Sequence, residues 1–280
     1  MAGEVSIYSE LYPKLLKDIP NPPKKLYFKG SLCTEIFEHC VAVVGSRNMS
    51  IYGRKVIDEL FSVLSKKITI VSGFMFGVDA EAHQKALQYG LKTIAVMPCG
   101  IDRIHPEDQE DLYHKIEENG LILSEYQDDF EPKVWTYPRR NRIVAGLSIM
   151  VVVVEASIKS GSLITARLSH SFGRKVCVVP GSIFSNLSAG KVQISNEFAN
   201  NIDSGFFINK YLSLSTVIDN QKDPIDCRED TILNLIKSDP MTVNELSKYT
   251  SKSISDLSIQ LTHLSLDGYV IERGGKFYAC

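Results

Sequence analysis

The feature that most limits how this chain can fold is an uninterrupted apolar run near its middle. Residues 149–154 read Ile-Met-Val-Val-Val-Val, and the first polar side chain after them is Glu155. A run of this length, rich in β-branched residues, is typical of a strand buried on both faces, because a half-exposed strand would alternate polar and apolar residues. Strands of this kind lie inside parallel sheets that have helices on both sides.

Shorter apolar runs repeat this pattern along the chain, with helical segments between them. They begin near Cys40, Ile68, Lys92, Leu121 and Lys175, and most end in glycine or serine. Alternating strands and helices predict an α/β fold with a doubly wound, mostly parallel, Rossmann-like sheet. From Ser182 to Asn201 the pattern weakens, and Ser, Asn and Gly dominate. We expect a surface loop there.

The composition of the chain predicts four parts. An N-terminal adapter segment is expected to pack on the edge of the main domain, and a polar linker is expected to separate that domain from a small C-terminal one. The parts are residues 1–38 (adapter), 39–215 (extended Rossmann-like domain), 216–227 (linker) and 228–280 (C-terminal domain).

The C-terminal part has the pattern of a winged helix. A first amphipathic helix is expected at 230–236, and capping boxes at Thr242 and Ser253 predict two more. The remaining residues, 268–278, read as a hairpin that turns at Gly274-Gly275.

Bulk composition excludes several classes of protein. The formal net charge is -2, so a site for nucleic acid must be a local basic patch. None of the 6 cysteines forms a Cys-x-x-Cys pair, which argues against a metal site and suits a reducing cytoplasm. No run reaches the roughly 18 apolar residues of a membrane helix, so we expect a cytoplasmic protein without membrane contact.

Small residues follow several of the expected strands. Gly45-Ser46-Arg47 ends the first strand of the main domain, and Ser72-Gly73 ends the second. Small residues at the carboxyl edge of a sheet let a phosphate approach the backbone, and an arginine there can pair with it. The alternative is an ordinary tight turn with a solvated arginine.

Three arginines gather just before the long apolar strand. Arg139, Arg140 and Arg142 are expected to precede a helix closely and to share its N-terminal region. Cations at that end oppose the helix dipole, which favours a bound anion nearby. One of them could instead pair with Asp102 or Glu125 as a structural brace.

The segment after the apolar strand completes the predicted crevice. Lys159 to Ser162 would offer hydroxyls and backbone N–H groups at a helix N-terminus, although Ser162 also suits a plain N-cap. Glu155 is expected to be structural, with contact to a ribose as the alternative. Two aromatic side chains, Phe74 and Phe76, are more typical of a core, but an exposed one could stack on a base.

Several catalytic signatures are absent from the sequence. The chain lacks Gly-x-Gly-x-x-Gly, the Walker pattern and Gly-x-Ser-x-Gly. No histidine spacing suits a metal, and no acidic pair suggests a metal nuclease. The sequence therefore predicts a phosphate-contacting crevice with no catalytic residue, no metal and no cofactor.

Taken together, these stretches resemble the DNA-processing protein A family (DprA, also called Smf) of bacteria. The matching pieces cover most of residues 40–183 in the family's order, and the tail resembles the winged helix that many members carry. The pieces are 41–47 (VAVVGSR), 71–73 with 77–79 and 82–83, 92–96 (KTIAV), 100–104 with Pro106, 123–126, 138–148 (PRRNRIVAGLS), 155–156 with 159–165, and 179–183.

The resemblance implies a single-stranded DNA-binding protein that is not an enzyme. Members protect incoming DNA in natural transformation, help to load a RecA-type recombinase and typically form homodimers. Carried over position by position, the resemblance implies DNA contacts from twelve residues: Gly45, Ser46, Arg47, Ser72, Gly73, Arg139, Asn141, Arg142, Lys159, Ser160, Gly161 and Ser162. Beside these, a base could stack on an aromatic such as Phe74 or Phe76, with burial in the core as the alternative.

Two other functions fit parts of the sequence. A nucleotide phosphoribohydrolase of the lysine-decarboxylase-like Rossmann group would need Pro-Gly-Gly-x-Gly-Thr and a catalytic glutamate, and 159–165 (KSGSLIT) has no such acid. A transcription regulator would read duplex DNA with the helix 253–266, whose one candidate cation is His263. The sequence supports both of these functions less well than it supports a recombination mediator.

Overall fold

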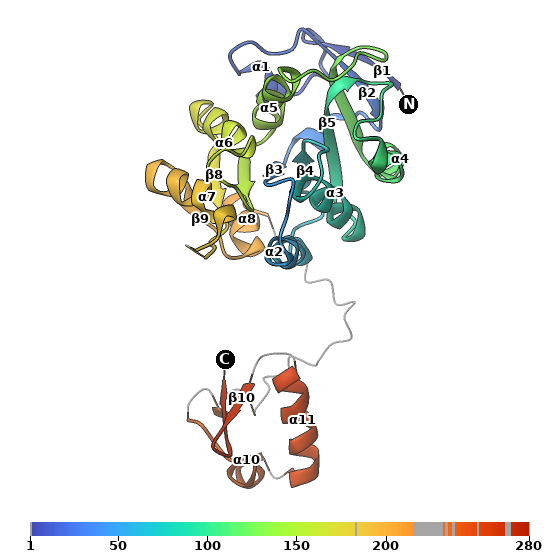
Figure 1. Ribbon diagram of the computed structural model, residues 1–280. Helices are drawn as coiled ribbons and strands as arrows, with labels where there is room; N and C mark the ends of the chain where they lie inside the picture. The colour runs from blue at the N-terminus through green and yellow to red at the C-terminus, as the bar shows by residue number, and fades with distance from the viewer. Residues whose placement is uncertain are drawn as a thin grey trace. The chain divides into compact units, whose positions relative to one another are not determined.

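The chain forms two compact units, residues 1–218 and 219–280. A computed structural model describes residues 2–182, 184–214, 232, 235–236, 239–250, 252–266 and 270–279. Figure 1 shows the two units as ribbons.

The larger unit is built on a nine-stranded sheet in the order β1-β2-β6-β5-β4-β3-β7-β8-β9. Neighbouring strands from β6 to β9 are parallel, and the pairs β1–β2 and β2–β6 are antiparallel. The predicted mostly parallel sheet is confirmed. The strands are β1 (Ala2–Ser6), β2 (Lys25–Gly30), β3 (Cys40–Val44), β4 (Thr69–Ser72), β5 (Lys92–Gly100), β6 (Leu121–Tyr126), β7 (Met150–Val153), β8 (Lys175–Val178) and β9 (Asn200–Asn201).

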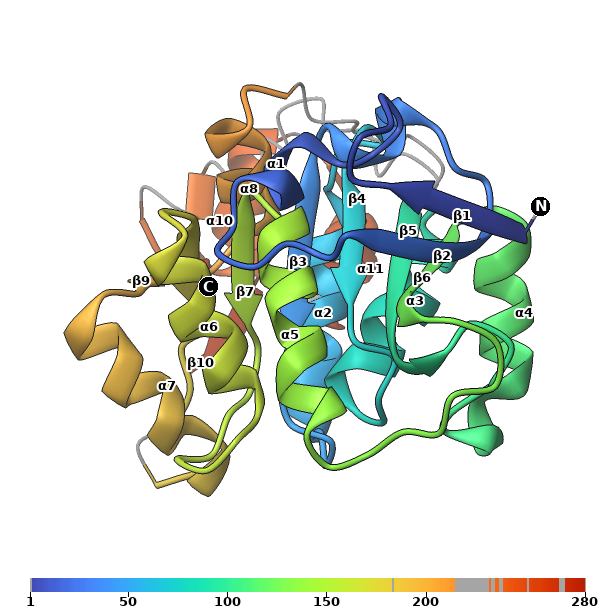
Figure 2. The same ribbon diagram turned by 90° about the horizontal axis from the view of Figure 1, so that it is seen from above.

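Helices cover both faces of this sheet, as Figure 2 shows. One face packs against α1 (Lys14–Lys17), α5 (Thr136–Leu147), α6 (Ser162–Ser171) and α7 (Asn186–Glu197). The other face packs against α2 (Ile51–Ser62), α3 (Val78–Gln88), α4 (Glu110–Asn119) and α8 (Gly205–Tyr211). Two 3-10 helices, η1 (Thr34–Phe37) and η2 (Glu107–Gln109), complete the unit.

Strand β7 has the double burial that its sequence predicts. Val151 and Val153 belong to the apolar core on the α5 side, and Met150 and Val152 belong to the core on the α2 side. All four side chains are fully buried. Because side chains alternate between the faces of a strand, a strand covered on both faces must be apolar at every position.

The order of the strands creates a crevice beside β7. The chain runs from β3 outward through β4, β5 and β6, and then returns to β7 on the opposite side of β3. The segments that follow β3 and β7 therefore diverge at the carboxyl edge of the sheet. Such a topological switch point is where open α/β sheets bind their ligands.

The expected surface loop at 182–201 is wrong, because most of it forms α7. Ser185 caps this helix through a hydrogen bond from the Leu187 backbone N–H, and Ile194 packs into the core below it. Its Ser, Asn and Gly content gives a low intrinsic helix propensity, which tertiary packing overrides here.

The arginine cluster also lies differently from expectation. Instead of preceding a helix, Arg139, Arg140 and Arg142 lie inside α5, the first two within about a turn of its start. The helix begins after Trp135, and Pro138 is its third residue, where a missing backbone N–H costs nothing.

The N-terminal segment packs on the edge of the sheet. Strand β2 pairs antiparallel with β6, and β1 adds one further strand beyond it. Tyr12 is buried beside them, and its hydroxyl donates to the Pro23 carbonyl at 2.7 Å. This segment extends the core without reaching the crevice.

The smaller unit holds α10 (Val243–Thr250), α11 (Ile254–Leu266), β10 (Val270–Arg273) and β11 (Lys276–Ala279). The two capping boxes are confirmed: Thr242 Oγ1 accepts from the Glu245 N–H at 3.2 Å, and Ser253 Oγ accepts from the Asp256 N–H at 3.1 Å. The hairpin turns at Gly274-Gly275, both with positive φ. The predicted linker 216–227 lies outside the described residues, as does most of the helix expected at 230–236.

Candidate nucleic-acid interface

A pocket of about 620 Å³ lies at the carboxyl edge of the sheet, where the segments after β3 and β7 diverge. Nine of the twelve predicted contact residues line it. They are Gly45, Ser46, Arg47, Gly73, Asn141, Lys159, Ser160, Gly161 and Ser162. Residues about 115 positions apart in sequence meet here because β3 and β7 are adjacent parallel strands.

The turn after β3 forms one wall of the pocket. Ser46 is fixed through its backbone, because its N–H donates to the Glu155 carbonyl at 2.8 Å and its carbonyl accepts from the Val78 N–H at 3.1 Å. Position 45 has no room for a side chain: a Cβ would lie 2.6 Å from a Val78 methyl group. Glycine therefore lets β3, β7 and α3 converge, and the turn holds Arg47 at the pocket.

The turn before α6 forms the opposite wall. The hydroxyls of Ser160 and Ser162 lie 2.7 Å apart, Gly161 is the N-cap residue of α6, and the Ser160 hydroxyl accepts from the Ser162 backbone N–H at 3.4 Å. The carbonyls of Ser160 and Gly161 accept from the next two N–H groups, those of Leu163 and Ile164, at 3.1 Å, so this wall attracts an anion through the positive end of the helix dipole. Lys159, which is exposed, adds a full positive charge to this wall.

Arg140 forms part of the pocket wall, although sequence reasoning did not place it among the contact residues. It is 4% exposed, and its guanidinium donates to the carbonyls of Gly73 and Val96. A Cβ at Gly73 would lie 2.5 Å from that guanidinium, so glycine is needed there to admit it. Burial lowers the pKa of Arg140, and the carboxylate of Asp79 opposes that effect.

Asp79 is the acidic side chain among the residues that line the pocket. Burial raises its pKa, while the positive charges of Arg140 and Arg47 and the hydrogen bond from the Met75 backbone N–H act in the opposite direction. Asp79 thus neutralises part of the charge of Arg140. Arg47 and Lys159 have no ion-pair partner in the part of the chain that the structure describes.

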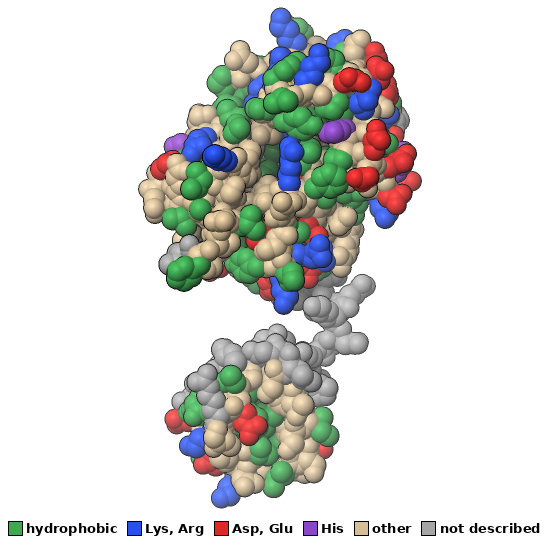
Figure 3. Space-filling view, viewed as in Figure 1, with side chains coloured by type: hydrophobic (Ala, Val, Ile, Leu, Met, Phe, Trp, Pro, Cys, Tyr) green, Lys and Arg blue, Asp and Glu red, His purple; other side chains and the backbone are tan. Residues whose placement is uncertain are grey.

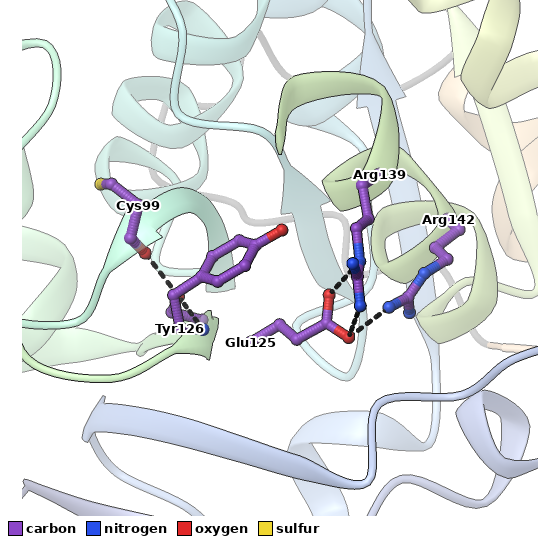
Figure 4. Close-up of polar contacts among 6 residues, drawn as sticks. Cys99, Glu125, Tyr126, Arg139 and Arg142 are labelled. Atoms are coloured by element: carbon purple, nitrogen blue, oxygen red, sulfur yellow. Dashed lines mark hydrogen bonds and ion pairs between the residues drawn. The ribbon is translucent and has the colours of Figure 1, made fainter. Parts of the chain in front are cut away.

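Ser72, Arg139 and Arg142 lie outside the pocket. The Ser72 hydroxyl is fully buried and donates to the Val43 carbonyl at 2.6 Å, which leaves it no access to a ligand. Both arginines point at Glu125 on β6, as Figure 4 shows. The brace to Glu125 that the sequence offered as an alternative is therefore present, and it uses two arginines instead of one.

The aromatic residues near the pocket also differ from expectation. Phe74 is fully buried against His83 and Tyr113, so the idea that it stacks on a base is wrong. Phe76 is 42% exposed. Tyr137, which sequence reasoning missed, lines the pocket: the Arg47 guanidinium lies 5.4 Å from its ring centre, and its hydroxyl lies 2.7 Å from His105 Nε2.

Glu155 has a structural role, as expected. It is 4% exposed, and its carboxylate accepts from the backbone N–H of Ser50 at 2.9 Å and from the Ser50 hydroxyl at 2.5 Å, at the start of α2. Nearby, Lys191 is buried and donates to the Val154 carbonyl at 2.8 Å. Burial lowers the pKa of Lys191 to about 8.

Charge is unevenly distributed over the larger unit. Figure 3 shows basic side chains beside a recess in this face and acidic side chains gathered toward α4. The described residues contain no group of three His, Cys, Asp or Glu side chains that could hold a metal ion. They also contain no helix that is long and apolar enough to cross a membrane.

Two family models match this chain. The model described as DNA recombination-mediator protein A matches residues 4–212, and the one described as DprA winged helix domain matches residues 220–276. The chain belongs to the DNA recombination-mediator protein A family. The resemblance read from the motifs around the pocket is thereby confirmed.

Individual members of the recombination-mediator family agree with this assignment. The DNA processing protein DprA of Streptococcus pneumoniae is 42% identical over 200 residues, which are 71% of each chain. The chain spans 66% of the length of the DNA processing protein DprA of Bacillus subtilis and 44% of the length of the protein Smf of Synechocystis.

Solved structures of family members share the fold. That of the Streptococcus pneumoniae protein superposes with a TM-score of 0.72 at 39% identity, covering 75% of this chain and 74% of that one. A Helicobacter pylori DNA processing protein A, whose structure is described in terms of its single-stranded DNA binding mode, gives a TM-score of 0.65 at 33% identity and covers 75% and 96%.

Proposed function

We propose that the pocket binds the phosphate backbone of single-stranded DNA. The observation that carries this proposal is the state of its cations: Arg47 and Lys159 line the pocket, and neither forms an ion pair with a described residue. Arg47 lies beside the N-terminus of α5 and Lys159 beside that of α6. A cation at a helix N-terminus is unfavourable unless a bound anion offsets both its charge and the helix dipole. Buried Arg140 adds to the same positive potential.

The shape of the site favours a single strand over a duplex. A pocket of about 620 Å³ is a recess between two turns. A single strand can bend its backbone into such a recess, whereas a duplex is stiff over about 150 base pairs and carries its phosphates on a convex surface. Glycine and serine turns bring backbone N–H groups close to phosphate oxygens without a sequence preference.

We further propose that the chain acts as a recombination mediator during DNA uptake and helps to load a RecA-type recombinase, as a homodimer. Family membership supports this step, and the absence of a catalytic constellation from the sequence agrees with a protein that is not an enzyme. On a single strand that is already covered by a single-strand-binding protein, the ATPase activity of the recombinase should start earlier when the present protein is added. Light scattering should give twice the chain mass.

The DNA proposal is tested by anisotropy of labelled single-stranded and duplex oligonucleotides over a salt series. We expect tighter binding of the single strand, with a slope of log affinity on log salt of about -0.7 per phosphate contact. Arg47→Ala should reduce that slope by about one contact. Arg167→Ala, which removes an exposed arginine of α6 outside the pocket, is the matched control and should leave it unchanged.

The rival functions give different results in the same experiment. Preference for the duplex would support a transcription regulator. If the protein bound neither DNA, or if Arg47→Ala had the same salt slope as the wild type, the pocket would not be the DNA-binding site. Release of base from nucleoside monophosphates would then support the phosphoribohydrolase.

A further inference from the structure

Three aromatic side chains form a cluster on the segment that joins β6 to α5, and we call it the aromatic ledge. Tyr126 and Phe130 stack with ring centres 4.6 Å apart and planes 12° apart. Trp135 packs edge-on against both, at 6.1 Å from Tyr126 and 6.3 Å from Phe130. Such edge-to-face pairs are favourable and hold a ring in one orientation. The indole of Trp135 is thus supported by protein, yet 48% of Trp135 is exposed.

Two positive charges lie over these rings, one from the same segment and one from α5, although Asp128, Asp129 and Glu131 also lie on the segment. The Lys133 ammonium lies 5.6 Å from the centre of Phe130, and the Arg139 guanidinium lies 5.9 Å from the centre of Trp135. Glu125 holds Arg139 in place through hydrogen bonds of 3.1 and 3.3 Å. Exposed aromatic faces interleaved with cations are the usual construction of surfaces that bind single-stranded nucleic acid.

The aromatic ledge is connected to the pocket along the chain. Val134 and Tyr137, on either side of Trp135 in sequence, both line the pocket. Val134 is 90% exposed, so a ligand that covered it would gain from burial of its apolar surface. A strand with a phosphate in the pocket would thus pass Val134 before its neighbouring nucleotide reaches Trp135.

We propose that the aromatic ledge is a base-stacking subsite for single-stranded DNA, with Trp135 as its platform. The proposal rests on the proposed function, because it takes the phosphate in the pocket as the anchor of the strand. Stacking on an indole needs only the π-face of a base, so the subsite would add affinity without reading sequence. It would also select against a duplex, whose bases are already stacked on one another.

The first test uses the fluorescence of the protein itself, since Trp135 is its sole tryptophan. Wild-type protein is titrated with oligothymidine and with an abasic oligomer of the same length and charge. We expect oligothymidine to quench the fluorescence strongly and the abasic oligomer to bind more weakly with little quenching. Equal quenching by both, or none by a bound oligothymidine, would overturn the subsite.

The second test separates stacking from packing. Trp135→Ala should weaken oligothymidine binding about 5- to 150-fold by anisotropy, with an unchanged salt slope and unchanged binding of the abasic oligomer. Trp135→Phe should retain most of the affinity. Phe206→Ala is the matched control, because Phe206 is 51% exposed on α8, which contributes nothing to the pocket lining.

The outcomes distinguish the subsite from the function on which it rests. If wild-type protein binds oligothymidine and Trp135→Ala binds it equally well, the subsite is wrong and the phosphate pocket stands. If Trp135→Ala weakens both oligomers alike, Trp135 supports the fold of the pocket and stacks no base. If wild-type protein binds neither oligomer, both proposals fail.

Discussion

Two sets of cations lie near the carboxyl edge of this sheet, and they differ in what satisfies their charge. Arg140 and Lys191 are buried and donate to backbone carbonyls, while Arg139 and Arg142 share the carboxylate of Glu125. Arg47 and Lys159 line the pocket without an ion pair to any described residue. A basic cluster in the sequence is therefore not yet a binding site. The charges left without a partner mark the site, and of the four satisfied ones Arg140 alone forms part of its wall.

This contrast predicts that the buried cations control stability and the pocket cations control binding. Arg140→Ala is the strongest test. It removes the donors to Gly73 and Val96 and leaves Asp79 buried without its positive neighbour, so unfolding should become easier by about 3–5 kcal/mol. Urea unfolding measures this loss.

The Asp79 partner gives the control for that substitution. Asp79→Asn together with Arg140→Ala should cost less than the sum of the two single changes, because neither charge is then left alone in the interior. A loss below about 1 kcal/mol for Arg140→Ala would mean that Arg140 behaves like the pocket cations.

Lys191 tests the same idea through pH. Its folded pKa is about 8 against 10.5 for a free lysine, so between these values the unfolded chain binds more protons than the folded one. Stability should therefore rise with pH across that window, by up to about 3 kcal/mol, and be at its lower plateau below pH 8. The measured quantity is the free energy of unfolding at pH 7.5 and pH 10, compared between wild type and Lys191→Met.

The comparison with Lys191→Met is needed because other groups titrate in this range. Burial raises the pKa of Cys99 and of Cys177 to about 11, which makes stability fall as pH rises, but both proteins share those thiols. If the variant shows the same pH dependence as wild type, Lys191 is charged and well solvated in the folded protein.

The Glu125→Gln substitution tests the two arginines that form ion pairs with Glu125 and lie outside the pocket. The Glu125 side chain is 14% exposed and that of Arg142 is 13% exposed, so loss of the carboxylate should cost about 1–3 kcal/mol in urea unfolding. The side chain of Arg139 is half exposed and would be released. Because it lies beside the aromatic ledge, the salt slope of single-strand binding should steepen by one contact, about 0.7.

Arg142→Ala is the matched control for Glu125→Gln. It removes the less exposed arginine and leaves the Arg139–Glu125 pair in place, so it should lower stability without altering the salt slope. If Arg142→Ala reduced the salt slope, Arg142 would contact the DNA, contrary to this prediction.

The sequence predicted the sheet and the small-residue turns because those features are local. A strand buried on both faces must be apolar throughout, as Met150 to Val153 are, and residues at the ends of adjacent parallel strands must meet. It did not predict α7, whose composition opposes helix formation. Nor could residue type alone separate Arg140 from Arg139 and Arg142.

A signal for Arg140 was nevertheless present. If 136–147 is read as a helix, the buried positions Thr136, Arg140, Ile143, Val144 and Leu147 follow helical spacing, which puts Arg140 on the core face. Arg139 and Arg142 then fall on neighbouring faces. The expectation from sequence instead placed the three arginines just before a helix, so the helical spacing was not applied to them.

Lys159→Ala should have the smallest effect on stability of these changes and still a clear effect on binding. The side chain is exposed, has no partner among the described residues and stands on a turn whose backbone is fixed without it, so unfolding should change by less than about 0.5 kcal/mol. The salt slope should lose about one contact, while Lys159→Arg should keep it. If Lys159→Ala instead lowered stability as much as Glu125→Gln does, its charge would have a partner within the fold, and the distinction between satisfied and free cations would fail at the pocket wall itself.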